Sequence, residues 1–326
     1  MTKYFLKKTA GTVPLLIGIT LITFLVIHLA PGSAVDAKAS FNPKMTAQAK
    51  AKLESLYGLD RPILVQYADW MGRLVRCDFG TSFVDGKPVT EKILQAAPVT
   101  LAINLGTLLL ILVLGIPLGV YGAVRAGTLG DKVLTVVVFA GFSVPTFWLS
   151  LILMSFFGVR LGWLPISGLH SLFYDEMGTW QQYLDLGRHL ILPIGVAAFT
   201  SVAGISRYVR SGMIQVLEKP YIRTARAKGL SRNRVIYGHA LPNVFLPLIT
   251  ILGLSIPGLL GGSVIFETIF SVPGMGRLFF DSVFTRDYPV IMGILTLGAC
   301  LTLLGNFLAD IGYALADPRI RVGEHS

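Results

Sequence analysis

The chain has 326 residues, of which 53% are hydrophobic and 14% charged, with a mean hydropathy of +0.67 and a net charge of +10. A soluble domain carries about 25% charged residues, so this composition argues against a soluble protein. The positive charge does not require nucleic acid, because membrane proteins hold Lys and Arg on their cytoplasmic side. The chain contains apolar runs near the length of a bilayer crossing, which is about 20 residues. These runs predict six transmembrane helices. In chain order they are Thr9–Leu29, Val99–Val124, Val133–Val159, His189–Tyr208, Val244–Phe266 and Val290–Leu315. The expected fold class is therefore an all-α integral membrane protein.

Proline and glycine residues predict how these helices are shaped and packed. Prolines inside a span imply kinks, here at Pro14, Pro117, Pro145, Pro193, Pro247 and Pro257. Rows of glycines suit close helix packing, here Gly115/Gly119/Gly122 and Gly258/Gly261/Gly262.

The charges of the short loops predict the orientation. The loop after the fourth span is strongly basic with Glu218 as its one acid, whereas the loops after spans three and five are mainly acidic. The positive-inside rule then places both termini in the cytoplasm. The expected organisation is an N-terminal helix (1–29), an extracytoplasmic loop region (30–98), a five-helix core (99–315) that contains a cytoplasmic loop (212–242), and a cytoplasmic tail (316–326). Lys7-Lys8 before an apolar run resembles a signal peptide, but the run exceeds a typical h-region of about 7–15 residues, which favours an uncleaved helix.

Several chemistries find no support in the sequence. Gly86-Lys87 lacks the upstream glycine of a P-loop, and the five histidines show no metal-ligand spacing. The spans are almost free of ionisable groups, which argues against an ion-coupled carrier. An intramembrane hydrolase using Ser143 or Ser150 with His28 stays open as an alternative, although serines in membrane helices usually bond or pack. Cys77 lies in the predicted outer loop and Cys300 in the last span, so they are expected to be free, with an intermolecular bridge of Cys77 as the alternative.

The segment from Tyr221 to Pro242 has the helix start and stop residues of a helix–turn–helix. Pro220 suits a first helical turn, Tyr221–Lys228 predicts two turns of helix, and Gly229 is a natural left-handed stop with Leu230 beside it. Ser231 is then a candidate N-cap for a second helix towards Leu241.

The helix–glycine–helix pattern predicts that this segment docks to a partner, with an ordinary basic cytoplasmic loop as the simpler alternative. Tyr221, Ile222, Ala225 and Gly229 share one face of the first helix, and the small residues keep the helix slim enough to enter a groove. A DNA-reading helix–turn–helix is the alternative, but membrane anchoring on both sides would hinder entry into a DNA groove.

The same segment, YIRTARAKGLSRNRVIYGHALPN, resembles the cytoplasmic EAA loop of permease subunits in bacterial binding-protein-dependent ABC importers. Within that family it resembles the dipeptide, oligopeptide and nickel permease group, of the dipeptide permease B type. Arg223 and Thr224 stand where the general EAA pattern has Glu and Ala, a departure that this group shares. Further motifs similar to that group lie, in order, at Leu56–Pro62, Asp78–Ser82, Gly261–Ser263 with Glu267, Pro273–Arg277, Arg286–Pro289 and Asp317–Arg321.

The resemblance implies a type I ABC importer permease fold in the bacterial inner membrane and a subunit that is not itself an enzyme. The implied partners are a second permease subunit, two cytoplasmic ATPase subunits, which would bind ATP and Mg, and an extracytoplasmic solute-binding protein, with no nucleic acid. No cofactor is expected in this chain. The implied cargo is di- or oligopeptides, with nickel chelates, glutathione or another small solute as the alternative. The residues expected to contact the ATPase are Tyr221, Ile222, Arg223, Thr224, Ala225, Arg226, Ala227, Lys228, Gly229 and Leu230.

Overall fold

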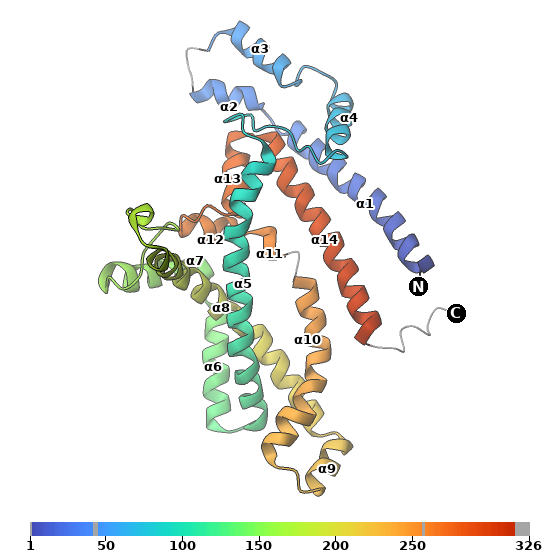
Figure 1. Cartoon of the computed structure of the whole chain (residues 1–326), viewed down its shortest axis with the longest axis vertical. Coiled ribbons are helices and arrows are strands. Elements are labelled where there is room, and N and C mark those ends of the chain that lie inside the picture. Colours follow the sequence, from blue (N-terminus) through green and yellow to red (C-terminus); the bar gives the residue numbers. More distant parts are fainter. Residues whose placement is uncertain (1, 42–44, 256–257, 317–326) are drawn as a thin grey trace. The chain divides into compact units, whose positions relative to one another are not determined.

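The computed structural model describes residues 2–41, 45–255 and 258–316 (Figure 1). Pro257 and the terminal motif Asp317–Arg321 lie outside the described residues. The chain divides into two compact units. Unit 1 comprises Met1–Thr100, Leu260–Val264 and Pro273–Leu304, and unit 2 comprises Leu101–Leu259, Ile265–Val272 and Gly305–Ser326.

The described part of unit 1 is mainly helical, and the segment predicted as a large extracytoplasmic loop contains helices joined by turns and irregular stretches. Its helices are α1 (Thr2–Leu29), α2 (Ala34–Phe41), α3 (Ala47–Leu56), α4 (Ile63–Leu74) and α13 (Met275–Thr285), with the first parts of α5 (Val89–Val124) and α14 (Tyr288–Ala316). The side chains of Phe24, Trp70 and Met292, from α1, α4 and α14, are buried together in one of its hydrophobic clusters. Within the described residues of the segment 30–98, α4 packs on the N-terminal helix α1.

Two of the quoted motifs in unit 1 meet at a buried carboxylate. Asp287, 1% exposed, accepts hydrogen bonds from the Ser82 hydroxyl at 2.5 Å and from the Phe83 backbone N–H at 2.8 Å. Lys92 Nζ lies 3.2 Å from Ser82 Oγ and 2.9 Å from Asp85 Oδ2. Burial raises the pKa of Asp85, but hydrogen bonds from Lys92, Ser82 and the Lys87 backbone lower it to about 2. A satisfied network of this kind fixes the loop before α5 against the start of α14.

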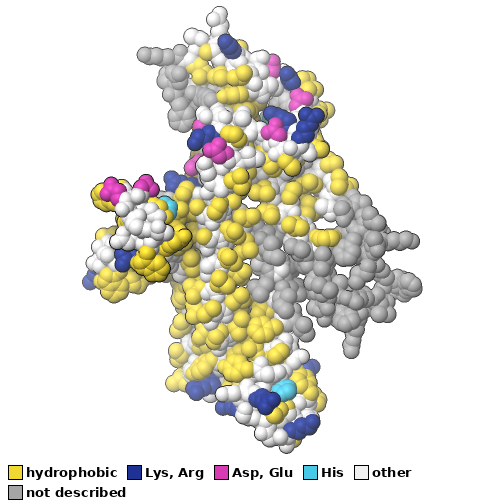
Figure 2. All heavy atoms as spheres, in the orientation of Figure 1, with side chains coloured by type: hydrophobic (Ala, Val, Ile, Leu, Met, Phe, Trp, Pro, Cys, Tyr) yellow, Lys and Arg dark blue, Asp and Glu magenta, His cyan; other side chains and the backbone are white. Residues whose placement is uncertain are grey.

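Unit 2 holds the remaining helices. They are the rest of α5, α6 (Leu129–Ser143), α7 (Thr146–Leu153), the π-helix η1 (Met154–Arg160), the 3₁₀ turn η2 (Tyr174–Glu176), α8 (Thr179–Leu217), α9 (Pro220–Ala227), the π-helix η3 (Arg234–Ala240) and α10 (Leu241–Ser255). Two short helices are shared between the units. Gly258 and Leu259 of α11 (Gly258–Gly261) belong to unit 2, and so do the residues of α12 (Val264–Ile269) from Ile265 onward. Hydrophobic side chains cover much of the visible surface over α5 and α6 (Figure 2). Such a surface suits contact with lipid rather than water.

Among the described residues, four helices are long and apolar enough to cross a membrane, and a bent pair makes a fifth if it is counted as one span. The four are Gly11–Leu29, Val89–Val124, Thr179–Leu217 and Tyr288–Phe307. The pair Leu129–Ser143 and Thr146–Arg160 is bent by 99° at the predicted third span. The bend lies at Pro145, whose preceding residue Val144 is extended, as a residue before proline prefers to be. The kink predicted there is confirmed, whereas Pro14 and Pro193 lie inside continuous helices.

The predicted fifth span is divided rather than continuous. α11 ends at Gly261 and α12 begins at Val264, with the non-helical residues Gly262 and Ser263 between them, while residues 256 and 257 after α10 lie outside the described residues. The side-chain amide of Asn104 in α5 donates hydrogen bonds to the carbonyl oxygens of Gly258 and Leu259, at 3.2 and 2.9 Å. Hydropathy reports only that the segment is apolar, so it could not reveal that the helix is interrupted.

The glycine row of α5 packs as predicted, against α8. A Cβ at Gly119 would lie 2.6 Å from the Ser206 carbonyl oxygen, and one at Gly115 would lie 3.1 Å from Ile205. The second row differs, because a Cβ at Gly258 or Gly261 would meet no described atom within 4 Å. The first row is therefore a close-packing face, whereas Gly258 and Gly261 of the second row do not pack closely against described residues.

The serines of the hydrolase alternative have structural roles. Ser143 Oγ donates to the Phe139 carbonyl oxygen at 2.9 Å, and Ser150 Oγ donates to that of Thr146 at 2.8 Å. Both bonds run to the preceding turn of the same helix, the usual arrangement of a hydroxyl in a membrane helix.

Candidate functional site

The candidate site is α9, which begins directly after the long helix α8. Lys219 is extended at the N-cap position, and Pro220 takes the first helical position. Proline is favoured there because its fixed φ suits a helix and its missing N–H would have no intrahelical acceptor. The turn between the two helices is closed by the Lys219 N–H, which donates to the Val216 carbonyl oxygen at 3.0 Å. The predicted helix over 221–228 is confirmed, displaced by one residue.

The end of α9 is a Schellman motif centred on Gly229. The Gly229 N–H donates to the Arg226 carbonyl oxygen at 3.0 Å, and the Leu230 N–H donates to that of Ala225 at 3.4 Å. Gly229 has φ +76°, the left-handed conformation that glycine adopts without penalty. Leu230 packs against the nearby hydrophobic cluster, the contact that accompanies such motifs. The predicted stop is confirmed in conformation and in its hydrogen bonds.

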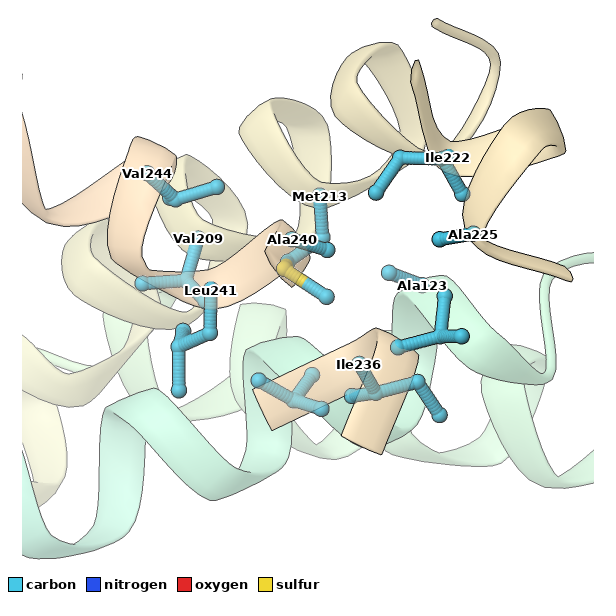
Figure 3. Packing of buried hydrophobic residues seen from close by; sticks show 11 residues of the cluster. Ala123, Val209, Met213, Ile222, Ala225, Ile236, Ala240, Leu241 and Val244 are labelled. Carbon is cyan, nitrogen blue, oxygen red and sulfur yellow. The ribbon is translucent and has the colours of Figure 1, made fainter. Parts of the chain in front are cut away.

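The inner face of α9 belongs to the protein's own core. Ile222 is fully buried and Ala225 is 7% exposed, in a cluster with Met213 of α8, Ala123 of α5 and Ile236 of η3. Figure 3 shows these side chains converging from the four elements. Of the four residues predicted to share one face of this helix, Ile222 and Ala225 are buried in the bundle, while Tyr221 and Gly229 are exposed. Residues three apart on a helix share a face. Ile222 and Ala225 are both apolar, so this face of α9 packs against the neighbouring helices.

The outer face of α9 is exposed and basic. Tyr221 is 44% exposed, and Arg223, Thr224, Arg226, Ala227, Lys228 and Gly229 are exposed as well. Figure 2 shows Lys and Arg side chains gathered around this end of unit 2. Among the residues described, no carboxylate lies within ion-pair distance of Arg223, Arg226 or Lys228. These cations are available to acidic groups of another molecule.

The segment after α9 is a π-helix rather than the ordinary helix that was predicted. Ser231 accepts the first backbone hydrogen bond, from the Val235 N–H at 3.0 Å, but the structure gives its hydroxyl no capping bond among the described residues. Val235 and Ala240 of η3 are buried in the same cluster as Ile222, and η3 continues into α10. α9 is thus joined through one core to α8 before it and to α10 after it. π-helical segments frequently occur at functional sites.

Sequence reasoning missed an ion pair between α6 and α8. Arg210 Nε and Nη2 donate to Asp131 Oδ1 and Oδ2 at 2.9 and 2.8 Å, a bidentate pair. Asp131 is 3% exposed and also accepts from the Gly127 N–H at 2.9 Å. Thr128 caps α6 by accepting from the Asp131 N–H at 3.4 Å. The sequence does signal the start of α6, because Thr128-Leu129-Gly130-Asp131 before an apolar run follows the capping-box pattern, but it gives no local signal for the pairing with Arg210.

The fold defines the class of protein. The chain is similar to the permease in inward-facing structures of the MetNI methionine ABC transporter, with a TM-score of 0.53 and 19% identity over 70% of this chain and 97% of that chain. This similarity shows the fold alone, that of a type I ABC importer permease. Residues 115–322 match the family described as the binding-protein-dependent transport system inner membrane component, and residues 1–104 match the N-terminal part of such a component.

Sequence relatives agree with the family. The oligopeptide transport system permease protein AppB of Bacillus subtilis is 44% identical over 98% of this chain and 99% of its own length. The di/tripeptide and dipeptide permease proteins DppB of Pseudomonas aeruginosa and Escherichia coli K12 are 40% and 36% identical over the same shares. The chain belongs to the inner membrane components of binding-protein-dependent transport systems. It is a multi-pass inner membrane permease that works with other ABC transporter components, and the predicted resemblance is confirmed.

Proposed function

We propose that this chain is a permease subunit of an ATP-driven importer of di- and oligopeptides, and that α9 is its coupling helix. The names of the full-length relatives support the peptide cargo. The observation that carries the coupling role is the division of α9 into two faces. Its inner face is sealed into the core shared with α5, α8 and η3, and its outer face offers unpaired cations. A partner that grips the outer face would move the helices attached to the inner face.

The partner in this proposal is one of two ATPase subunits. ATP binding would close the ATPase pair and displace α9, and the displacement would pass into α8 and α10 through the buried side chains of Ile222, Met213 and Val235. A recess of about 420 Å³ beside α9, lined by Leu217, Arg226, Leu230 and Arg232 among others, could receive a side chain of that subunit. ATP and Mg would be bound by the ATPase chains, and this subunit would carry out no covalent chemistry.

The other partners follow from the same proposal. A second permease subunit would form the other half of the translocation path. A solute-binding protein would deliver peptides to the segment 30–98, whose described residues include the helices α2, α3 and α4. The proposal keeps the predicted organisation of the chain: an N-terminal transmembrane helix (1–29), an extracytoplasmic region (30–98), a permease core (99–315) that contains the coupling segment 212–242, and a cytoplasmic tail (316–326).

The proposal requires α9 to lie in the cytoplasm and α4 outside. Cys77, which follows α4, is exposed. With Cys300 replaced by Ser, Cys77 should react with a membrane-impermeant maleimide in intact spheroplasts. In a variant with neither native cysteine, Lys228→Cys should react only after permeabilisation. The reverse pattern of labelling would invert the orientation and remove α9 from reach of a cytoplasmic ATPase.

Reversing a charge on the outer face of α9 should weaken association with the ATPase. Arg223→Glu is expected to reduce ATPase co-purification about tenfold, because losing a charged hydrogen bond at an interface costs about 1.5–3 kcal/mol and each 1.4 kcal/mol is tenfold. Ala227→Trp, at an exposed position of the same helix, should also weaken the association with the ATPase, but by steric bulk and without a change of charge. Pull-down of the ATPase by the purified permease pair measures both.

Point variants are preferable here to deletion of Tyr221–Pro242. Deletion would also remove the buried side chains of Ile222, Val235 and Ala240, so any loss could reflect a damaged core. Lys132→Glu is the matched control, an exposed basic residue in α6 of the same unit. Equal loss of the ATPase in the control and in Arg223→Glu would show a nonspecific charge effect and reject α9 as the docking element.

A further inference from the structure

Unit 1 contains an apolar groove of about 650 Å³ between α1, α13 and the start of α14. All three of these parts belong to the same compact unit. The groove runs along the last residues of the membrane-crossing stretch Gly11–Leu29 and the first residues of the stretch Tyr288–Phe307. It therefore lies at one end of two candidate membrane spans, where the hydrocarbon of a bilayer meets the lipid headgroups.

The floor of the groove is a packed hydrophobic cluster. Tyr288 and Ile291 are 7% and 5% exposed, and Ile27, Phe279 and Leu295 pack against them. The side chains along the rim are apolar as well but exposed, namely Ile22, Val26, Val283 and Phe284. Lipid tails are as apolar as these side chains, whereas water needs polar partners that the walls do not offer. In a bilayer the groove is therefore filled by hydrocarbon.

The headgroup end of the groove carries a cation. Among the described residues that line the groove, Arg286 is the one with a charged side chain, and it lies just before the span that begins at Tyr288. Arg286 Nη1 donates to the Gly32 carbonyl oxygen at 2.8 Å, and the Tyr288 hydroxyl donates to the same oxygen at 3.2 Å. The guanidinium lies on the Gly32 backbone, where a Cβ would come within 3.2 Å of it. These contacts hold the half-buried cation at the mouth of the groove.

Arg286 keeps hydrogen-bond donors for another group. Among the described residues, no carboxylate lies within ion-pair distance of Arg286, and its Nε and Nη2 have no hydrogen-bond acceptor. The adjacent carboxylate of Asp287 is directed instead to Ser82 and Phe83. A guanidinium has five N–H donors and binds phosphate oxygens in pairs, so the unused donors suit a phosphate.

The backbone at Arg286 also points to a use for its side chain. Arg286 is the C-cap residue of α13 and has φ +54°, the left-handed conformation that glycine usually supplies at the end of a helix. Residues other than glycine that are held in this region occur mostly at functional sites and ligand clamps. A glycine here would relieve the backbone but would remove the cation from the groove.

We propose that this groove binds an anionic phospholipid, with an acyl chain between α1 and α14 and the phosphate on Arg286. The order of the groups matches that of a lipid, because the cation lies at the headgroup end and the apolar walls extend from it into the spans. A zwitterionic lipid would bring a second cation close to Arg286 and should bind less well. The inference depends neither on the peptide cargo nor on the coupling role of α9.

The test is lipid retention by the full chain within the assembled importer. The complex is purified in detergent, offered equal amounts of phosphatidylglycerol and phosphatidylcholine with the same acyl chains, and examined by native mass spectrometry. Phosphatidylglycerol should be retained about tenfold more than phosphatidylcholine, as expected for a charge-assisted contact. Arg286→Gln should remove this preference, because glutamine keeps a donor for the Gly32 carbonyl oxygen but carries no charge. Arg286→Lys should keep part of the preference.

Two further variants separate the groove from the charge. Val26→Trp, which fills the groove from an exposed position of α1, should reduce retention of both lipids. Arg76→Gln is the matched control and should leave the preference unchanged, because Arg76 is an exposed arginine of unit 1 that does not line the groove. The preference of the unaltered complex and the Val26→Trp result decide the question even if Arg286→Gln does not fold.

Three results would overturn the inference. The first is equal retention of the two lipids by the unaltered complex, or an unchanged preference in Arg286→Gln. The second is displacement of phosphatidylglycerol by inorganic phosphate at equal concentration, which would show an anion site that needs no acyl chain. The third is cross-linking of a photoreactive residue at position 26 to another protein subunit rather than to lipid, which would assign the groove to a subunit contact.

Discussion

Replacing Gly229 with valine should reduce ATP-driven peptide uptake by the assembled importer at least tenfold while membrane insertion stays normal. Gly229 has φ +76°, and a β-branched residue held in that conformation costs about 1–3 kcal/mol. The chain should relax to a negative φ and break the hydrogen bonds to Arg226 and Ala225. Since no described atom lies within 4 Å of a Cβ at this position, the effect should come from backbone conformation alone.

Two control variants separate conformation from general damage. Gly229→Asn should retain most uptake, because asparagine tolerates the left-handed region better than other residues with a Cβ. Gly162→Val introduces the same strain elsewhere in unit 2, since Gly162 has φ +64° and also no neighbour within 4 Å. Gly162→Val should transport normally. Substrate-stimulated ATP hydrolysis at the level of the unaltered complex in Gly229→Val would refute the coupling role of α9.

The local structure of α9 was predictable because its signals are local. Pro220 and Gly229 act on their own φ and on hydrogen bonds within five residues, so sequence alone locates the start and the stop. The face that α9 buries was not predictable in the same way. Ile222 and Ala225 could face a partner groove or the bundle, and only the positions of Val120 and Ala123 of α5, distant in sequence, decide between them.

The limits of hydropathy have a similar origin. An apolar run indicates that a segment lies in an apolar environment, but it does not indicate whether the helix is continuous. The bend at Pro145 could be predicted from the proline, whereas the division of the fifth span could not be predicted from hydropathy. The motifs Asp78–Ser82 and Arg286–Pro289 were both recognised, but their union through Ser82 and Asp287 joins residues 205 positions apart. Pairings over such distances are set by tertiary packing and leave no local signal.

Replacing Asp131 with asparagine should destabilise the permease by about 2–4 kcal/mol, because removing one partner of a buried ion pair leaves the other charge uncompensated. Asp131 is 3% exposed, whereas the Arg210 side chain is 36% exposed. Arg210→Gln should therefore reduce stability at least as much as Asp131→Asn, because it leaves the more deeply buried charge without its partner. Thermal unfolding in detergent, followed by size-exclusion chromatography, should show both losses. Arg61→Gln is the control, since the Arg61–Asp69 side chains are 59% and 52% exposed and such pairs contribute about 0–1 kcal/mol.

The double variant Asp131→Asn/Arg210→Gln should lose less stability than the sum of the two single losses, because neither charge is then left alone. Exchanging the pair, as Asp131→Arg with Arg210→Asp, should not restore stability. The carboxylate at position 131 also accepts the Gly127 N–H and lies in the first turn of α6, where the helix dipole favours an anion and disfavours a cation. Full recovery in the exchanged variant would show that charge complementarity alone matters. Failure to recover would show that Asp131 holds the turn between α5 and α6 as well as Arg210.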